Sequence, residues 1–96
     1  MILEVAILNV RKGKGFEFET AFAEAREIIA VSEGYISHEL QKCLEVENQY
    51  ILLVKWQSLE AHTEGFRGSA GYQKWKEMLH HFYDPFPTVL HYSTDF

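Results

Sequence analysis

The chain is poor in cysteine, in basic residues and in long apolar runs, and each shortage excludes a class of protein. Cys43 is the only cysteine, so no disulfide can form within the chain, and a reducing cytoplasm is the expected location. The nine Lys and Arg against 14 Asp and Glu give a net charge of −5, and a nucleic-acid partner is not expected because phosphate neutralisation requires a basic patch. No apolar run approaches the ~20 residues that span a bilayer. The first residues lack the basic region of a signal peptide, so no membrane partner is expected.

Motifs for phosphate binding, nucleophilic catalysis and metal binding are also missing. The glycines between positions 65 and 71 are evenly spaced, but they match neither the dinucleotide fingerprint nor the Walker spacing. His80 and His81 follow Glu77 closely, yet adjacent residues of a helix point in different directions. Metal sites usually need three or four protein ligands. The sequence therefore predicts no metal, and it offers no support for acyl-transfer chemistry.

Hydrophobic residues, by contrast, are abundant. They make up 47% of the chain, and aromatic residues make up 15%. A chain of this length forms one domain, residues 1–96, which buries roughly 60–65% of its unfolded surface. So large an apolar content in so small a domain suggests that part of the surface is hidden against a partner.

Hydrophobic periodicity divides the chain into six elements. A nearly continuous apolar run predicts the first strand, and apolar residues at helical spacing from Phe16 predict a helix that Gly34 ends. Ser58 is the expected N-cap of a second helical region, Ser69 is expected to cap its continuation, and the residue before Pro85 ends it. The strands are expected at residues 2–10, 35–46, 50–56 and 88–92.

The order strand, helix, strand, strand, helix, strand predicts an α+β, ferredoxin-like βαββαβ fold. Such a fold has a four-stranded antiparallel sheet with two helices on one face. Two helices can cover only one face, whereas the first and third strands are apolar on both. Since a large exposed apolar patch is rare on a monomer, we expect a homodimer in which the two sheets pack face to face.

Segments along nearly the whole chain share a further pattern. They are Ile2–Val5, Lys12-Gly13 before a helix with Phe18 and Phe22, Gly34–Leu40, Leu52–His62, Phe66–Ser69 and the closing strand Pro87–Tyr92. In this order and spacing they resemble the antibiotic biosynthesis monooxygenase domains, a family of dimeric α/β-barrel proteins. The resemblance implies the same ferredoxin-like fold and the same dimeric architecture.

The resemblance also implies candidate chemistries. Some family members oxygenate polycyclic aromatic phenols with neither metal nor flavin: the phenol loses a proton, and the electron-rich anion reacts with dioxygen. Others degrade haem through an Asn, a Trp and a His, but these positions fall at Ala6, near Phe66 and near Lys76. Quinol-oxidising members carry histidines where this chain has Gly65 and Gly71. Haem degradation and quinol oxidation are therefore disfavoured, and no cofactor is expected.

Four aromatic residues are candidate walls of a substrate pocket. Trp56 ends the third strand, and its indole suits either the core or a pocket wall. Phe66, Tyr72 and Trp75 lie at helical spacing, and such a stripe is more often core than site. Tyr72 is the best of these for chemistry, because its hydroxyl group can hydrogen-bond a substrate oxygen.

Two histidines on strands are candidate bases. His38 lies among apolar residues, where it is either a core residue satisfied by a neighbour or a base aimed into a cavity. His91, on the last strand, has the same two interpretations. His62 is expected to face solvent. The pocket is expected between Trp56 and Tyr72, facing His38.

Three functions remain open at this point. The first is a cytoplasmic, homodimeric, cofactor-independent monooxygenase that acts on a small aromatic or polyphenolic compound. Its catalytic residues would be His38, Tyr72 and His91, with Trp56, Phe66 and Trp75 binding the substrate. The second is a non-catalytic module that binds a small aromatic metabolite. The third is a dimerisation module whose aromatic residues form only the core.

Overall fold

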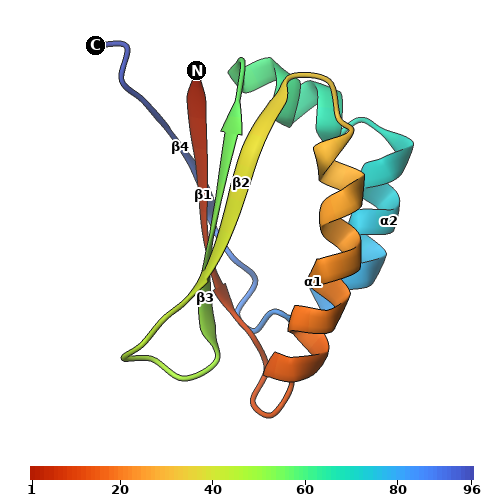
Figure 1. Cartoon of the computed structure of the whole chain (residues 1–96), viewed down its shortest axis with the longest axis vertical. Coiled ribbons are helices and arrows are strands. Elements are labelled where there is room, and N and C mark those ends of the chain that lie inside the picture. Colours follow the sequence, from red (N-terminus) through yellow and green to blue (C-terminus); the bar gives the residue numbers. More distant parts are fainter.

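The computed structural model describes residues 1–96, and the chain in it combines four strands with two main helices (Figure 1). The strands are β1 (Ile2–Asn9), β2 (Tyr35–Lys42), β3 (Gln49–Trp56) and β4 (Val89–Ser93). The helical elements are α1 (Gly15–Ala30), the π-helical turn η1 (Ala61–Phe66), α2 (Ala70–Leu79) and the 3₁₀ turn η2 (His80–Phe82). None of these helices has the length and apolarity needed to cross a membrane.

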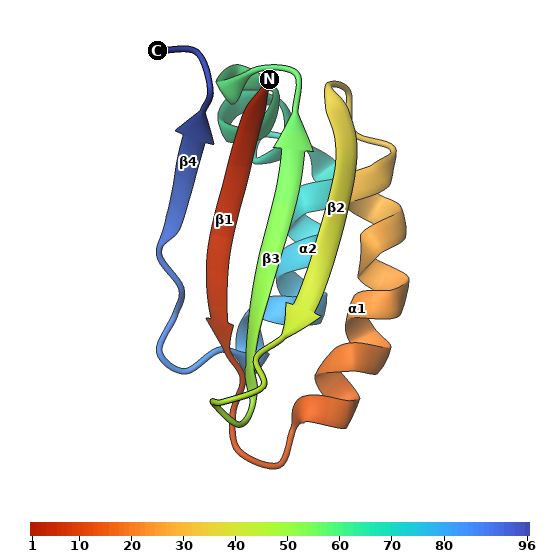
Figure 2. The ribbon, with the colours of Figure 1, turned by 60° about the vertical axis from the view of Figure 1, so that its left-hand side comes forward.

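The four strands form one antiparallel sheet in the order β2-β3-β1-β4. Both main helices lie on one face of this sheet, and the opposite face carries no helix (Figure 2). The central strands β1 and β3 pair along their whole lengths, from Ile2 opposite Trp56 to Asn9 opposite Gln49. The predicted α+β, ferredoxin-like arrangement is therefore confirmed.

The core lies between the sheet and the two helices. The residues that α1 buries are Phe18, Phe22, Ala25 and Ile29. Their helical spacing is the pattern that predicted this helix. On the sheet, alternate residues of β3 from Tyr50 to Trp56 are buried, because successive side chains of a strand point to opposite faces. The rings of Phe18 and Tyr50 meet across this layer, with centroids 4.9 Å apart.

Two serines shape the chain between β3 and α2, as predicted. Ser58 Oγ accepts a hydrogen bond of 3.2 Å from the backbone N–H of Ala61. Ser69 Oγ accepts one of 3.2 Å from the backbone N–H of Tyr72. Each serine thereby satisfies a donor that has no helical partner. Between the two serines, η1 is wound as a π-helix that turns two of its side chains inward.

The strand β2 is shorter than predicted, and its faces are arranged differently. It ends at residue 42 rather than 46, and Leu44 is 93% exposed in the turn that follows. The pairing register with β3 shifts near the start of the strand, and such a bulge breaks the alternation of faces. Ile36, which lies at this shift in register, is exposed.

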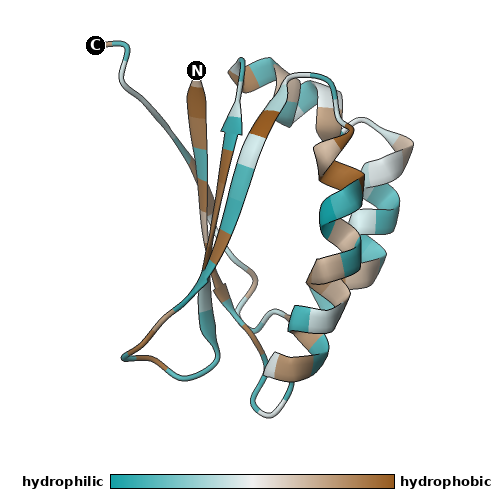
Figure 3. Cartoon of the chain, viewed as in Figure 1, coloured by the Kyte–Doolittle hydropathy of each residue, from teal (hydrophilic) through white to brown (hydrophobic).

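The face of the sheet that carries no helix is apolar along its centre. Hydrophobic segments follow β1 and β3 (brown in Figure 3), and the register places Val5 between Leu53 of β3 and Leu90 of β4. The apolar residues of this outer face are Leu3, Val5, Ile7, Ile51, Leu53, Leu90 and Tyr92. Leu90 and Tyr92 are 52% and 53% exposed, so the outer face presents hydrocarbon to its surroundings.

Candidate functional site

A cavity of about 370 Å³ lies between the sheet and the second helical region. The strands β1, β3 and β4 form its floor, and η1, α2 and the segment after α2 form its walls. The lining is mainly apolar and aromatic with a few polar groups, which is typical of a small-molecule site. Its polar and aromatic lining includes Glu4, His62, Phe66, Tyr72, Trp75 and Tyr83.

Glu4 places a carboxyl group in this cavity. It lies on the helix-facing side of β1 and is only 5% exposed. Its Oε1 accepts a 2.9 Å hydrogen bond from the indole N–H of Trp56, on the neighbouring strand β3. Its Oε2 makes no hydrogen bond with the protein, although every fully buried side-chain polar atom has a partner. Oε2 is therefore open to the cavity that Glu4 lines.

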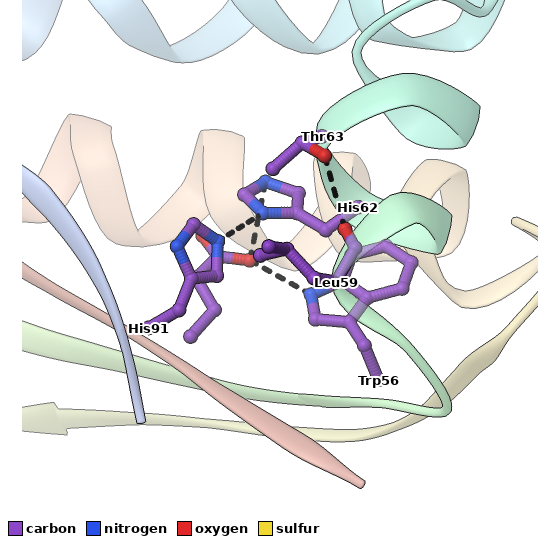
Figure 4. Close-up of polar contacts among 6 residues, drawn as sticks. Trp56, Leu59, His62, Thr63 and His91 are labelled. Atoms are coloured by element: carbon purple, nitrogen blue, oxygen red, sulfur yellow. Dashed lines mark hydrogen bonds and ion pairs between the residues drawn. The ribbon is translucent and has the colours of Figure 1, made fainter. Parts of the chain in front are cut away.

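Two histidines extend from Glu4 toward the edge strand β4, and Figure 4 shows His62 beside His91. His62 is 4% exposed, and its Nε2 lies 3.4 Å from Glu4 Oε1. Its Nδ1 lies 2.8 Å from Nε2 of His91, which is half-buried on β4. His91 stands opposite Glu4 in the pairing of β4 with β1, so both side chains project from the same face of the sheet.

Burial keeps both histidines neutral near neutral pH. It lowers the pKa of His62 to about 3, with further contributions from the positive charge of Arg67 and from His91. Burial and Arg67 also lower the pKa of His91. The pKa of Glu4 is raised by burial, although its hydrogen bond from Trp56 and the charge of Arg67 oppose this shift. The contact between His62 and Glu4 is therefore one between a neutral imidazole and a carboxyl group that holds its proton more tightly than usual.

Aromatic rings close the cavity on the side of the helices. Phe66 meets Tyr72 and Trp75 edge-on, with ring centroids 5.4 and 5.6 Å apart. Tyr83 is 7% exposed, and burial together with the nearby charge of Glu4 raises its pKa. The hydroxyl groups of Tyr72 and Tyr83 have no hydrogen-bond partner in the protein, so both are available to a ligand in the cavity.

The structure brings several of the predicted site residues together. Phe66, Tyr72 and Trp75 line the cavity, and His91 reaches it through His62. Trp56 is 0% exposed and lies beneath the cavity rather than in its wall. Its indole belongs to the core, and its N–H group holds Glu4 in place.

His38 lies apart from these residues. It lines a separate hollow between α1 and β2, where its Nδ1 is 2.5 Å from the hydroxyl oxygen of Tyr35. The pocket was expected to face His38, and the structure corrects this. The prediction that His62 faces solvent is also wrong, because the π-helical winding of η1 turns this side chain inward.

Sequence reasoning missed Glu4 and Tyr83 as cavity residues. The signal for Glu4 was present, because it is the only charged residue in an apolar strand and a buried carboxyl group requires a partner. Tyr83 has no comparable signal, since it reaches the cavity only when the segment after α2 folds back to Val10, just after β1. The pairing of His62 with His91 likewise depends on tertiary structure.

The network of Glu4, His62 and His91 has the composition of a metal site but not its geometry. No three His, Cys, Asp or Glu side chains in residues 1–96 are grouped so that they could hold a metal ion. His62 lies between the other two residues and presents a different ring nitrogen to each. This arrangement instead suits the passage of a proton across the imidazole.

Comparison with known proteins places these features in a family. A family model described as antibiotic biosynthesis monooxygenase matches residues 1–78. The uncharacterized protein YczJ of Bacillus subtilis (strain 168) is 54% identical over 93 residues, which cover 97% of this chain and 98% of that relative.

Solved structures show the same fold. A protein of Bordetella bronchiseptica, provisionally assigned to the antibiotic biosynthesis monooxygenases, is 28% identical with a TM-score of 0.92, over 99% of this chain and 97% of that chain. SnoaB of Streptomyces nogalater, a cofactor-independent oxygenase, is 22% identical with a TM-score of 0.74, over 95% of this chain and 87% of that chain. At this identity the likeness to SnoaB shows the fold alone.

Proposed function

This chain belongs to the antibiotic biosynthesis monooxygenase family, and we propose that it is a cofactor-independent monooxygenase that acts on a small aromatic or polyphenolic compound. The observation that carries the proposal is the carboxyl group of Glu4, which is buried yet opens through Oε2 into a cavity walled by aromatic rings. A buried acid with a raised pKa in a cleft is a strong candidate for proton transfer.

The cavity limits the size and character of the substrate. Its volume of about 370 Å³ lies toward the small end of ligand pockets, and we expect a compound of about two or three fused rings. Phe66 and Trp75 offer ring contacts to such a compound. The free hydroxyl group of Tyr72 can hydrogen-bond a substrate oxygen.

The proposed reaction begins with removal of a proton. Glu4 Oε2 takes the proton of a substrate hydroxyl group, and the resulting phenolate gives electrons to dioxygen to form a ring carbon–oxygen bond. The O–O bond of this peroxide then breaks as the same carbon loses its hydrogen, so one oxygen atom stays in a quinone and the other leaves as water. Tyr72 and Tyr83 stabilise the phenolate by hydrogen bonds.

We also propose that two copies of the chain associate through the outer face. The helices cover only one side of the sheet, while Val5, Leu53 and Leu90 form the centre of an apolar stripe on the other side. A second copy would cover this stripe with an identical one. The polar and charged residues of β2 on the same face, such as Glu39, would then lie toward the rim, where interfaces are usually polar.

Oxygen uptake with a dihydroxynaphthalene tests the proposed function. The wild-type protein should consume dioxygen and release a quinone in equal amounts. Glu4→Gln should lower kcat by about a hundredfold or more, because general-base catalysis typically contributes 10²–10⁴-fold. The amide carbonyl of Gln can still accept the hydrogen bond from Trp56, so this variant should fold. Glu24→Gln, the same substitution at an exposed position on α1, is the matched control.

The same assay separates the enzyme from the alternatives. A phenol that binds and is recovered unchanged would identify a non-catalytic binding module instead. If no member of a panel of naphthols and anthracenols binds or is oxidised, both the oxygenase and the binding-module hypotheses are wrong. The protein would then be a dimerisation module with an aromatic core.

A further inference from the structure

Glu4, His62 and His91 form one continuous line of polar contacts from the cavity to the edge of the sheet. The three residues come from three different elements: Glu4 lies on β1, His62 on η1 and His91 on β4. As an inference that rests on the proposed function, we propose that His62 and His91 are positioning residues that relay the substrate proton from Glu4 to solvent. Neither histidine has to touch the substrate for this role.

The geometry gives each group of the relay an entry atom and an exit atom. Glu4 faces the cavity with Oε2 and faces His62 with Oε1. His62 faces Glu4 with Nε2 and faces His91 with Nδ1. His91 uses Nε2 toward His62, and its Nδ1 makes no hydrogen bond with the protein. An imidazole can accept a proton at one nitrogen while it releases one from the other.

Packing holds the middle of the relay in place. The ring of His62 lies nearly parallel to the indole of Trp56, with centroids 5.2 Å apart and an interplanar angle of 19°. The ring of Phe66 covers His62 at 6.4 Å. Trp56 also fixes Glu4 by the hydrogen bond that its indole N–H donates to Oε1. One buried side chain therefore orients two members of the relay.

The transfer balances with one proton entering and one leaving. A proton from the substrate hydroxyl group binds Glu4 Oε2 as the proton on Oε1 passes to Nε2 of His62. The proton on Nδ1 of His62 passes to Nε2 of His91, and the proton on Nδ1 of His91 goes to water. The 3.4 Å separation of Glu4 Oε1 and His62 Nε2 must shorten during this step, as contacts in ligand-free active sites commonly do.

Burial favours the neutral forms of the three relay groups, whereas the charge of Arg67 favours neutral histidines but an ionised Glu4. Arg67 follows η1 and Tyr83 follows α2, and both line the same cavity as Glu4. Burial and Arg67 lower the pKa of both histidines, while burial raises the pKa of Glu4. A neutral imidazole has a free nitrogen that can accept a proton. His80 lies farther along the cavity wall, and burial lowers its pKa as well.

Anaerobic mixing with a nitronaphthol tests the relay without any oxygenation. Its phenolate has a distinct visible absorbance, so stopped-flow measurement gives the rate of deprotonation in the cavity. His91→Gln keeps a hydrogen bond to His62 but cannot pass a proton, and we expect deprotonation to slow by about tenfold or more with an unchanged Kd. In His91→Ala, added imidazole should restore the rate, because it can occupy the gap beside His62. His81→Gln, at an exposed histidine, should behave as wild type.

The outcomes distinguish this relay from the proposed function. A wild-type rate in His91→Gln, or a slow rate in His91→Ala that imidazole does not raise, would overturn the relay even if oxygen uptake is normal. An effect of His91 on deprotonation without any oxygen uptake would retain the relay and reject the monooxygenase.

Nitrogen NMR of the ligand-free protein gives a second test that needs no substrate. The relay requires His62 to carry its proton on Nδ1 in the ligand-free protein, because its Nε2 must be free to accept the proton that Glu4 delivers. In Glu4→Gln the amide carbonyl faces Trp56 and His62, so the His62 proton should move to Nε2. The same tautomer in both proteins would show that Glu4 does not deliver a proton to His62, and the relay would be wrong.

Discussion

Each face of the sheet carries residues that are unusual for its surroundings. The face that the helices cover holds Glu4 and His91, whereas the face without helices carries Val5, Leu53 and Leu90. A buried carboxyl group and an exposed apolar stripe are both unfavourable in an isolated domain. The difference teaches that folding alone explains neither face. We attribute the polar groups of the covered face to a ligand and the apolar groups of the outer face to a second copy of the chain.

Truncation of Trp56, on the covered face, should cause the largest loss of stability. Trp56 is 0% exposed, so Trp56→Ala should cost about 4 kcal/mol of the free energy of unfolding. Leu90→Ala on the outer face should cost less, and its effect should depend on protein concentration because a dimer is linked to concentration. Urea unfolding at two concentrations measures both. If Trp56→Ala and Leu90→Ala lose the same free energy of unfolding at both concentrations, the two faces do not differ in this way.

A charge placed on the outer face should separate the two copies. Val5→Asp puts an unpaired carboxylate at the centre of the apolar stripe, and burying it in the dimer would cost about 3 kcal/mol or more. Sedimentation velocity at micromolar concentration should show a dimer for wild type and a monomer for Val5→Asp. Ala70→Asp, which adds the same charge at an exposed position on α2, should remain dimeric. A wild-type protein that sediments only as a monomer contradicts the proposed assembly.

The fold could be predicted from the sequence because its signals are local. The apolar spacing of Phe18, Phe22 and Ile29 and the caps at Ser58 and Ser69 are all confirmed. Each of these features depends on residues within a few positions of one another. The strand ends were less accurate, since the bulge in β2 and its early end depend on pairing with β3, which no local pattern records.

The candidate site could be predicted only in part, because it is assembled from distant segments. Phe66, Tyr72 and Trp75 were found as one helical stripe and do line the cavity. Glu4 and His91 come from opposite ends of the chain, and only the antiparallel pairing of β1 with β4 brings them together. His62 was misplaced because a short polar segment suggested a surface turn, whereas its π-helical winding turns the ring inward.

The burial of His62 should also make the free energy of unfolding depend on pH. The pKa of His62 is about 6.5 when unfolded and about 3 when folded, so the unfolded chain binds more protons between these values. His62 therefore favours the folded state above about pH 6.5, and this contribution is lost as pH falls. Relative to His62→Gln, wild type should lose about 2–3 kcal/mol between pH 7.5 and pH 4.5.

Urea unfolding of both proteins at the two pH values measures this difference. The raised pKa of Glu4 changes stability with pH in the opposite direction. It favours the folded state at low pH, and this contribution is lost as pH rises. Because both proteins retain Glu4, the comparison isolates His62. If His62→Gln loses as much stability as wild type between pH 7.5 and pH 4.5, His62 is not buried in a neutral form.

The smallest effect should come from the hydroxyl group of Tyr72, and it distinguishes the two hollows beneath the covered face. Tyr72 lines the cavity of Glu4, so Tyr72→Phe removes one hydrogen bond to the substrate, worth about 1 kcal/mol, and should lower kcat/KM about threefold to tenfold. Tyr35 instead bonds His38 in the other hollow, and Tyr35→Phe should leave kcat/KM unchanged. If Tyr35→Phe has the larger effect, the chemistry belongs to His38, and Glu4 is only a satisfied core residue.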